Sequence, residues 1–517
     1  MAPSFELHPA LAVTALLLVL LVAHYLVDQY GARRHYPPGP RGLPILGNLL
    51  QLSRDAWVPF RRMKEKYGPI VYLNVFGHNI VVLNTLKASA DLLDRQSAVY
   101  SDRPTVPTAD TLTGSMFFPT MKHGERWSKM RRIAQECLSK GASRMVHPHQ
   151  LKEALLMTDA LLRSPRNWDA QLRRASASII ASATYGLSSL ESEDDPEVTR
   201  VNEFAYTLLA WITPTKFVSE FLIKYLPTSM SKAKKGAQYW FEEYTSRFTC
   251  LYKDSVTRMS QGGSKTNLTN IVCNRKDRFG LNDTESAWLL AAMFSAGSET
   301  TSSVLMWFIF MMVTYPDIQA KAQEELDSVI GRSRLPSFAD LDQLHYVRAI
   351  VRETLRWGPV IPLGVPHRAT EDNWYQGYYI PKGTICVANV WSINRDPELY
   401  GKDAEIFNPS RHLDEHGHLN PALVDTKDES HATYGFGKRI CVGRHVANNS
   451  LFISIATILW AMKIKPPKDV NGCDILPSAD NIVNTGLIMR PVFFECNFEP
   501  RFPDAETVIA NEKELIV

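Results

Sequence analysis

The spacing of hydrophobic positions changes along the first two thirds of the chain. Between residues 57 and 100 a short helical segment gives way to alternating apolar runs at 70–75 and 80–83, which predict a small β-sheet. From about residue 125 to residue 355 apolar residues recur at helical spacing. This long stretch predicts a predominantly helical body after the sheet.

Short strands and turns return after Arg368. They comprise strand-like runs at 378–380, at 384–387 and near Leu487 and Val492, with a Pro-Lys-Gly turn at 381–383. The whole pattern predicts a mainly α protein with small β-sheets. Because no linker composition follows residue 50 and no internal repeat is present, we expect residues 49–517 to form one large domain.

The N-terminus carries a long apolar run, PALAVTALLLVLLVAHYLV, at 9–27. At ~1.5 Å per residue the run spans roughly 28 Å, about the thickness of a bilayer core. We therefore expect residues 1–30 to form a single-pass anchor in the endoplasmic reticulum membrane. The basic residues that follow place the body in the cytosol by the positive-inside rule. A cleaved signal peptide is disfavoured, because the run is long and no Lys or Arg precedes it.

Residues 31–48 are basic and Pro-rich, and they include Pro-Pro-Gly-Pro-Arg-Gly-Leu-Pro at 37–44. Proline fixes φ and blocks helix formation, so we expect a stiff extended hinge between the anchor and the body.

Composition narrows the class of protein. Of the 517 residues 45% are hydrophobic and 21% are charged, and the formal net charge is +3, which argues against a nucleic-acid partner. The seven cysteines are odd in number and show no metal-ligand spacing. They indicate a reducing compartment and not a disulfide framework.

A second apolar stretch, 286–315, is also long enough to cross a membrane. Its middle holds a cluster of Ser and Thr residues around Glu299, and a carboxylate at mid-membrane is costly and rare. We therefore expect a long helix buried in the core, with polar atoms at a reactive centre.

One cysteine stands in a loop rich in glycine, Tyr434-Gly435-Phe436-Gly437-Lys438-Arg439-Ile440-Cys441-Val442-Gly443. The pattern Gly-x-Arg-x-Cys-x-Gly occurs once in the chain and resembles the haem-binding loop of the cytochrome P-450 family. A dinucleotide-binding loop beginning at Gly435 is rejected, because the third glycine is missing and no βαβ unit surrounds it.

The resemblance implies a cytochrome P-450 fold and a role for each residue of the loop. Cys441 would be the axial thiolate ligand of haem b, and such a thiolate favours O–O cleavage in dioxygen. Arg439 would pair with a haem propionate, while Gly437 and Gly443 would allow a tight turn and close approach of the backbone to the porphyrin. Tyr434 replaces the family's usual phenylalanine, and its hydroxyl needs a partner that can alter the tuning of the sulfur.

The segment Ala296-Gly297-Ser298-Glu299-Thr300-Thr301 resembles the family's oxygen-activation turn. By this resemblance Gly297 would open the helix beside the iron. Glu299 and Thr300 would form an acid–alcohol pair that relays protons.

A Glu-x-x-Arg pattern at Glu353 and Arg356 places both side chains on one helical face. The resemblance implies that they bind Arg411 and so fix the loop that carries the cysteine. Glu197-x-x-Arg200 also matches the pattern, so position along the chain decides the assignment.

Trp127 and Arg131 resemble the family's Trp-x-x-x-Arg helix, whose side chains reach a haem propionate. Trp57-x-x-x-Arg61 also matches but lacks the helix-start residues that precede Trp127. Arg368 stands where the family often has another propionate contact.

Three histidines, His412, His416 and His418, raise the question of a metal site. They stand beside Asp414 and Glu415 but lack convincing zinc spacing. We expect a solvated loop.

The resemblance implies a monooxygenase that inserts one atom of dioxygen into a hydrophobic small molecule, by hydroxylation or epoxidation. Because the chain has no flavin or nicotinamide fingerprint, the electrons would come from NADPH through a separate reductase. A basic face formed by Lys129, Arg132, Lys438 and Arg444 would bind that reductase. No obligate oligomer is expected.

The chain resembles fungal members of the family that modify natural products. This resemblance favours a terpenoid or polyketide of secondary metabolism as the substrate. The implied pocket segments are mostly apolar and lie at 103–119, 207–222, 292–300, 360–365 and 485–488. A haem-thiolate isomerase or dehydratase and a non-catalytic haem-binding protein are the alternatives. The acid–alcohol pair argues against both.

Overall fold

The computed structural model describes residues 35–53, 55–192 and 230–516, together with isolated positions at 13, 16, 19, 20, 194–196, 199, 203, 204, 207 and 208. The expected anchor over residues 1–30 therefore lies almost entirely outside the described residues. Among the residues described, no single helix is long and apolar enough to cross a membrane. Helices α13 (Asp283–Thr314) and α14 (Pro316–Val329) meet that criterion only together, as a pair bent by 104°.

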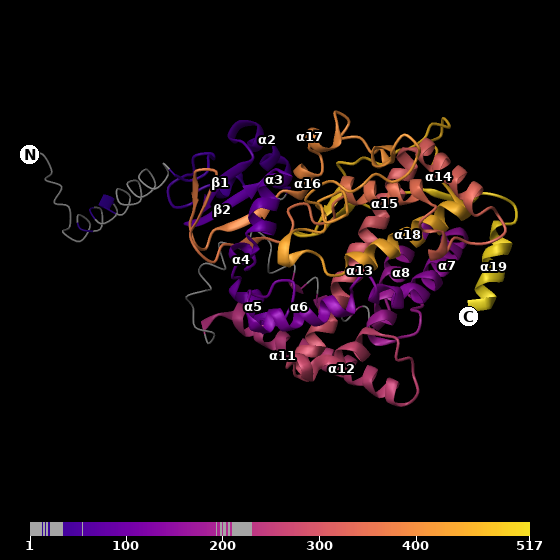
Figure 1. Ribbon diagram of the computed structural model, residues 1–517, viewed down its shortest axis with the longest axis horizontal. Helices are drawn as coiled ribbons and strands as arrows, with labels where there is room; N and C mark the ends of the chain where they lie inside the picture. The colour runs from indigo at the N-terminus through magenta and orange to yellow at the C-terminus, as the bar shows by residue number, and fades with distance from the viewer. Residues whose placement is uncertain are drawn as a thin grey trace, which may run out of the picture.

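Helix α13 runs through the middle of the helical part (Figure 1). A capping box starts it, in which the Asn282 side chain accepts from the Glu285 amide at 2.8 Å and the Glu285 carboxylate accepts from the Asn282 amide at 3.1 Å. Most residues from Ser286 to Val313 are buried. The prediction of a buried core helix over 286–315 is therefore confirmed.

The other helices surround α13 or cover the sheet. Their bounds are α2 (Trp57–Tyr67), α3 (Leu86–Ser89), α4 (Ser97–Tyr100), α5 (Pro107–Leu112), α6 (Glu125–Cys137), α7 (His147–Arg163), α8 (Trp168–Tyr185), α11 (Lys232–Ser260), α12 (Leu268–Phe279), α15 (His345–Trp357), α16 (Val390–Ile393), α17 (Pro397–Tyr400), α18 (Arg444–Ala461) and α19 (Ala505–Ile516).

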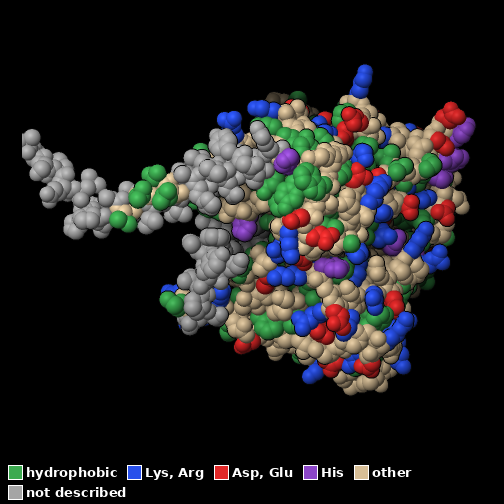
Figure 2. Space-filling model, turned by 60° about the vertical axis from the view of Figure 1, so that its left-hand side comes forward, with side chains coloured by type: hydrophobic (Ala, Val, Ile, Leu, Met, Phe, Trp, Pro, Cys, Tyr) green, Lys and Arg blue, Asp and Glu red, His purple; other side chains and the backbone are tan. Residues whose placement is uncertain are grey.

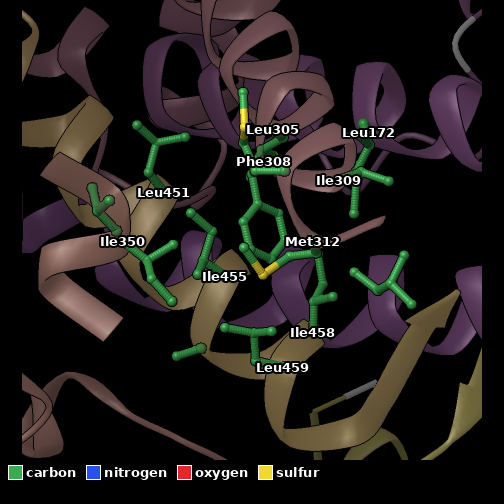
Figure 3. Packing of buried hydrophobic residues seen from close by; sticks show 14 of the residues in the cluster. Leu172, Leu305, Phe308, Ile309, Met312, Ile350, Leu451, Ile455, Ile458 and Leu459 are labelled. Atoms are coloured by element: carbon green, nitrogen blue, oxygen red, sulfur yellow. The ribbon is translucent and has the colours of Figure 1, made fainter. Parts of the chain in front are cut away.

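Two apolar clusters fill the helical part, and α13 belongs to both. Its first half, as far as Phe294, packs with residues of α6, α8 and α11. Its second half, from Val304 on, packs with α7, α14, α15 and α18, and in Figure 3 Phe308 of α13 points toward Ile455 of α18. The stretch 295–303 between the two halves is rich in Ser and Thr, so the apolar core is interrupted at this level.

A four-stranded sheet with the order β1-β2-β6-β3 lies beside the helices. β1 (Ile70–Val75) and β2 (His78–Leu83) pair antiparallel, and β2 runs parallel to β6 (Ile385–Ala388). The strands predicted at 70–75, 80–83 and 384–387 are thus confirmed, although the sequence did not show that they share one sheet. The two-residue strand β3 (His367–Arg368) was not predicted, and a bridge joins its Arg368 to Asp102.

The described residues also form three two-stranded sheets. They pair β4 (Asn373–Tyr375) with β5 (Tyr378–Ile380), β7 (Met462–Lys465) with β10 (Asn497–Pro500), and β8 (Ile482–Asn484) with β9 (Met489–Pro491). The strand expected at 378–380 is confirmed as β5. The structure is mainly α with small sheets, as predicted.

The Pro-rich segment 37–42 lies against β1. The Tyr72 amide donates to the Pro38 carbonyl oxygen at 2.9 Å. A side chain at Gly39 would collide with the Tyr72 carbonyl oxygen, 1.9 Å from its Cβ position. This part of the expected hinge is therefore packed on the sheet.

Charged side chains of both signs are interspersed on the face shown in Figure 2. This distribution agrees with the net charge of +3.

Candidate active site

Cys441 lies between a short 3-10 turn, η9 (Gly437–Arg439), and the first turn of α18. Its amide donates to the Tyr434 carbonyl oxygen at 2.8 Å, and the Gly443 amide donates to its sulfur. Protein atoms lie on several sides of the residue, yet Cys441 is accessible.

The surroundings of Cys441 shift the pKa of its thiol in opposite directions. Burial raises its pKa, while the Gly443 N–H and the guanidinium groups of Arg131 and Arg444 lower it in part. The net shift is upward, so the free thiol stays protonated near neutral pH. A bound metal ion would displace that proton, because the thiolate is the form that ligates.

Two glycines of this loop meet different surroundings. Gly437 has a φ of +58°, and a Cβ there would lie 2.0 Å from the Leu93 carbonyl oxygen in the π-helix η2 (Ala90–Arg95). The Gly437 amide donates to the Asp94 carboxylate. The tight turn expected at Gly437 is present, but its close approach is to protein backbone. An added Cβ at Gly443 would meet nothing within 4 Å.

Three arginines converge on the cysteine loop. Arg131, from α6, donates to the Ile440 carbonyl oxygen at 2.7 Å. Arg439 donates to the Ser101 carbonyl oxygen at 2.8 Å and stacks over the Trp127 ring at 4.1 Å. Arg103, which the sequence did not single out, is buried. It acts electrostatically on Arg439, and the three side chains form a cationic group.

This cationic group lacks matching negative charge. Burial lowers the pKa of Arg131 to about 10 and that of Arg439 to about 9. It lowers the pKa of Arg103 well below its ordinary value, and Arg439 adds to that shift. Among the described residues, Asp102 is the one carboxylate that offsets these shifts.

Several buried donors in the same place have no protein partner in the described part of the chain. They are Trp127 Nε1, Arg131 Nε and Arg439 Nη1. Buried donors are rarely left unpaired, so the site is built to receive an anion with several oxygen atoms. The two propionates of a haem, with the iron at Cys441, fit this set of donors.

Arg368, expected to contact a propionate, lies outside the cationic group. About a third of its side chain is exposed, and its guanidinium lies 4.0 Å from Asp102 and 3.4 Å from Thr105. Its neighbour His367 is buried instead, with its ring 2.7 Å from the Tyr100 carbonyl oxygen, and burial together with Arg103 lowers its pKa. His367 and not Arg368 thus lies beside Arg103, because successive residues of a strand face opposite sides.

The middle of α13 is partly accessible, whereas most of the rest of the helix is buried. Ala296 is exposed, and Gly297 and Thr300 are partly accessible. Gly297 does not create this opening: a Cβ there would lie 3.0 Å from the Ile180 side chain of α8. The role expected for Gly297 is therefore corrected, since its missing side chain permits close packing of two helices.

Glu299 and Thr300 have different surroundings. Glu299 is buried, and burial raises the pKa of its carboxyl, with Arg490 and Arg173 offsetting only part of the shift. The group is therefore able to hold a proton closer to neutral pH than an ordinary glutamate. The Thr300 hydroxyl donates to the Ala296 carbonyl oxygen at 2.7 Å, which leaves its oxygen free to accept.

The structure brings Glu353, Arg356 and Arg411 together. Arg356 donates to both carboxylate oxygens of Glu353, at 2.6 and 2.7 Å, and Arg411 donates to one of them at 3.1 Å. Glu353 and Arg356 are fully buried. Burial alone would raise the pKa of Glu353, but hydrogen bonds and charge from Arg356 and His412 outweigh it and lower the pKa strongly.

The prediction that His412 belongs to a solvated loop is wrong. Its Nε2 lies 2.9 Å from a Glu353 carboxylate oxygen, and the side chain is buried. The turn η8 (Pro409–His412) folds it back onto α15. His416 and His418 are exposed as expected, and no group of three metal-ligating side chains occurs among the described residues.

The alternative Trp-x-x-x-Arg pair lies elsewhere. Trp57 packs in the apolar cluster with α13, and Arg61 pairs with Glu405 and lies over the Trp391 ring at 5.4 Å. Trp127 and Arg131 are the pair that borders the cysteine loop.

Comparison with known proteins agrees with this geometry. The cytochrome P-450 family model matches residues 37–491. A cytochrome P-450 monooxygenase of Armillaria gallica is 44% identical over 517 residues, which cover 99% of this chain and 98% of the relative. The monooxygenases iboC of Amanita muscaria and claR of Ampulloclitocybe clavipes are 39% and 33% identical, over 93% and 95% of this chain and 94% and 91% of their own lengths.

The chain belongs to the cytochrome P-450 family, a class of haem-thiolate proteins. Within that class it is a cytochrome P-450 monooxygenase.

Proposed function

We propose that this monooxygenase binds haem b through Cys441 and inserts one oxygen atom of dioxygen into a C–H or C=C bond of a hydrophobic small molecule. The observation that carries the proposal is the accessible Cys441 beside the unpaired buried donors Trp127 Nε1, Arg131 Nε and Arg439 Nη1. When bound, the haem would be held by the Cys441 sulfur and would supply oxygen activation.

The chain's own residues hold that cofactor in place. Arg103, Arg131 and Arg439 pair with the propionates, as charge-assisted hydrogen bonds to carboxylates are strong. The Gly443 N–H and the N-terminal end of α18 stabilise negative charge on the sulfur. The cluster around Glu353 fixes the approach to the cysteine loop, because its Arg356 donates to the Asn394 carbonyl oxygen at 2.5 Å, and the Asn394 side chain bonds the residues just before Tyr434.

Glu299 and Thr300 move protons to the reacting centre. Burial raises the pKa of the Glu299 carboxyl, which makes it a better proton acceptor than an ordinary glutamate. The Thr300 hydroxyl donates to the Ala296 carbonyl oxygen, so its lone pairs would accept a hydrogen bond at the accessible part of α13. A non-catalytic haem carrier has no need of this pair.

Electrons come from NADPH through a separate reductase. Of the four basic residues expected to form its docking face, Arg132 and Lys438 are exposed. Lys129 pairs with Glu125 at 2.8 Å, and Arg444 is largely covered and lies 3.7 Å from Glu429. Arg132 and Lys438 are therefore the pair to test. The double variant Arg132→Glu with Lys438→Glu should slow the first reduction step at low salt. The control Arg62→Glu, which changes an exposed arginine on α2, should leave it unchanged. Equal rates in wild type, the double variant and the control would reject this face.

The substrate is a terpenoid or polyketide of secondary metabolism. The expected pocket segments at 103–119, 292–300 and 360–365 supply mainly apolar side chains, among them Phe117 and Phe294, and apolar linings suit such ligands. The segment 207–222 lies mostly outside the described residues. Residues 1–30 anchor the enzyme in the endoplasmic reticulum membrane, with the body in the cytosol.

The test is turnover of the full chain in detergent with an added reductase, NADPH and a library of terpenoids and polyketides. A monooxygenase of this kind consumes dioxygen and NADPH and forms a product that carries one labelled atom from isotopic dioxygen. A product formed without dioxygen would favour the isomerase or dehydratase. Haem binding without turnover of any class would favour a carrier.

A further inference from the structure

A closed ring of contacts joins the cysteine loop to α18 and to Glu429. The Tyr434 hydroxyl donates to the Asn448 side-chain oxygen at 2.7 Å, and the Asn448 amide nitrogen donates to the Glu429 carboxylate at 2.7 Å. The other Glu429 oxygen lies 3.7 Å from Arg444 Nε. Arg444 in turn reaches the Cys441 carbonyl oxygen at 3.4 Å, and the Cys441 amide returns to the Tyr434 carbonyl oxygen at 2.8 Å.

The chain builds this ring from three neighbouring elements. Arg444 and Asn448 stand four residues apart on α18, so they share one face of the helix. Tyr434 belongs to the loop before Cys441, and Glu429 is the buried end of the segment that precedes it. The Tyr434 hydroxyl has only one proton, which it donates to Asn448. That donation fixes which end of the Asn448 amide faces Glu429.

Arg444 makes the longest contacts of the ring. The two strong hydrogen bonds lie on the Tyr434 side, whereas Arg444 is held to Glu429 at ion-pair distance only and its Nε has no hydrogen-bond partner among the described residues. Arg131, the other cation that acts on Cys441, is fixed by its bond to Ile440. The position of Arg444 is therefore the adjustable part of the positive charge near the sulfur.

We propose that Tyr434, Asn448 and Glu429 are positioning residues that hold the Arg444 guanidinium against the cysteine loop and thereby set the reduction potential of the iron bound by Cys441. The inference rests on the proposed haem site. A positive charge close to the iron favours the reduced state, which carries one positive charge fewer. Loss of the Tyr434 hydroxyl frees Asn448, loosens Glu429 and lets Arg444 swing toward solvent. The potential then falls.

The experiment measures the reduction potential of the haem-loaded full chain in four proteins: wild type, Tyr434→Phe, Arg444→Gln and the double variant. Tyr434→Phe removes the hydroxyl oxygen and keeps the aromatic ring of the side chain. We expect it to lower the ratio of reduced to oxidised protein about threefold at a fixed poise, which is about 28 mV for a one-electron couple at 59 mV per tenfold change. Arg444→Gln lowers the potential as well. In the Arg444→Gln background, Tyr434→Phe has no further effect, because the charge it positions is gone.

Tyr375→Phe is the matched control. Its hydroxyl also bonds a carboxylate, Asp91 at 2.7 Å, but it lies in the cluster with the four-stranded sheet. We expect no change in potential for this variant.

Two results overturn the inference. One is an unchanged potential in Tyr434→Phe, and the other is an equal shift with and without Arg444. The carbon monoxide spectrum of each reduced protein separates this failure from failure of the proposed function. A thiolate-type band with an unchanged potential rejects only the proposed role of the contact ring. A missing band in the wild type rejects Cys441 as the ligand.

Discussion

Gly437 offers a sharp test of how the cysteine loop is held. An alanine there takes a positive φ, which costs about 1–2 kcal/mol. It also places a Cβ 2.0 Å from the Leu93 carbonyl oxygen and 3.2 Å from the Ser97 Cβ. Since the nearest atoms are Leu93 backbone atoms, one of the two segments must shift, and such overpacking costs a further 1–3 kcal/mol, roughly.

Gly435 supplies the matched control two residues away. Its φ is +75°, but an added Cβ meets nothing within 4 Å. Gly435→Ala therefore carries the cost of the backbone conformation without the collision, about 1–2 kcal/mol.

The assay is urea unfolding of the haem-loaded full chain, followed by loss of haem absorbance. We expect Gly437→Ala to lower the midpoint about twice as far as Gly435→Ala and to reduce haem content on purification. Equal midpoints for the two variants would refute the reasoning, because the contact with Leu93 would then add nothing to the cost of the positive φ.

Three further predictions follow from the site. Burial lowers the pKa of His431 to about 3, and His412, Arg352 and Arg356 add to the shift against the opposing Glu353. As the pH falls, the unfolded chain therefore binds the proton before the folded chain does, and stability present above pH ~6.5 is lost. Between pH 7 and pH 5 the wild type should lose about 2 kcal/mol more than His431→Phe in urea unfolding. Parallel pH profiles of the two proteins would contradict this. Arg103→Gln should speed haem transfer to an acceptor globin about tenfold, the equivalent of one charge-assisted hydrogen bond of about 1.5 kcal/mol, while Arg368→Gln leaves the rate near that of wild type; the reverse order would restore the original assignment of Arg368. Glu299→Gln should cut product formed per NADPH consumed by at least tenfold, since general acid–base groups contribute about a hundredfold or more, and unchanged coupling would remove Glu299 from the proton path.

The sequence was sufficient for the fold class and for the elements with a strong periodic signal. The strands at 70–75 and 80–83 and the helix over 286–315 were found because their hydrophobic spacing is long or regular. Strand β3 was missed because two residues carry no period. That omission had a consequence for the site, since β3 places His367 and not Arg368 beside Arg103.

Residues whose role depends on the partner they meet were harder to predict. Gly297 stands in a motif at the reactive centre, yet its requirement comes from Ile180 on another helix. His412 stands among polar loop residues, yet a single turn buries it against Glu353. Local composition reports neither contact, because both join residues more than fifty positions apart.

Tyr434 illustrates the opposite case. The sequence flagged it as a departure from the family pattern, and a buried hydroxyl requires a partner. The partner, Asn448, and its continuation to Glu429 and Arg444 follow from the position of α18 beside the loop. A Tyr at this position together with an Asn four residues after the first residue of the next helix is a signal to seek in other chains.

The central claim is that Cys441 is the thiolate ligand of a haem. The most direct measurement is the carbon monoxide difference spectrum of the reduced full chain, compared for wild type, Cys441→Ser and Cys473→Ser, the last being an exposed cysteine in the turn that follows Asp469. Wild type and Cys473→Ser should show the red-shifted Soret band of a thiolate-ligated haem, and Cys441→Ser should lose it. A thiolate band that persists in Cys441→Ser, or that is absent from the wild type with haem bound, would contradict the account.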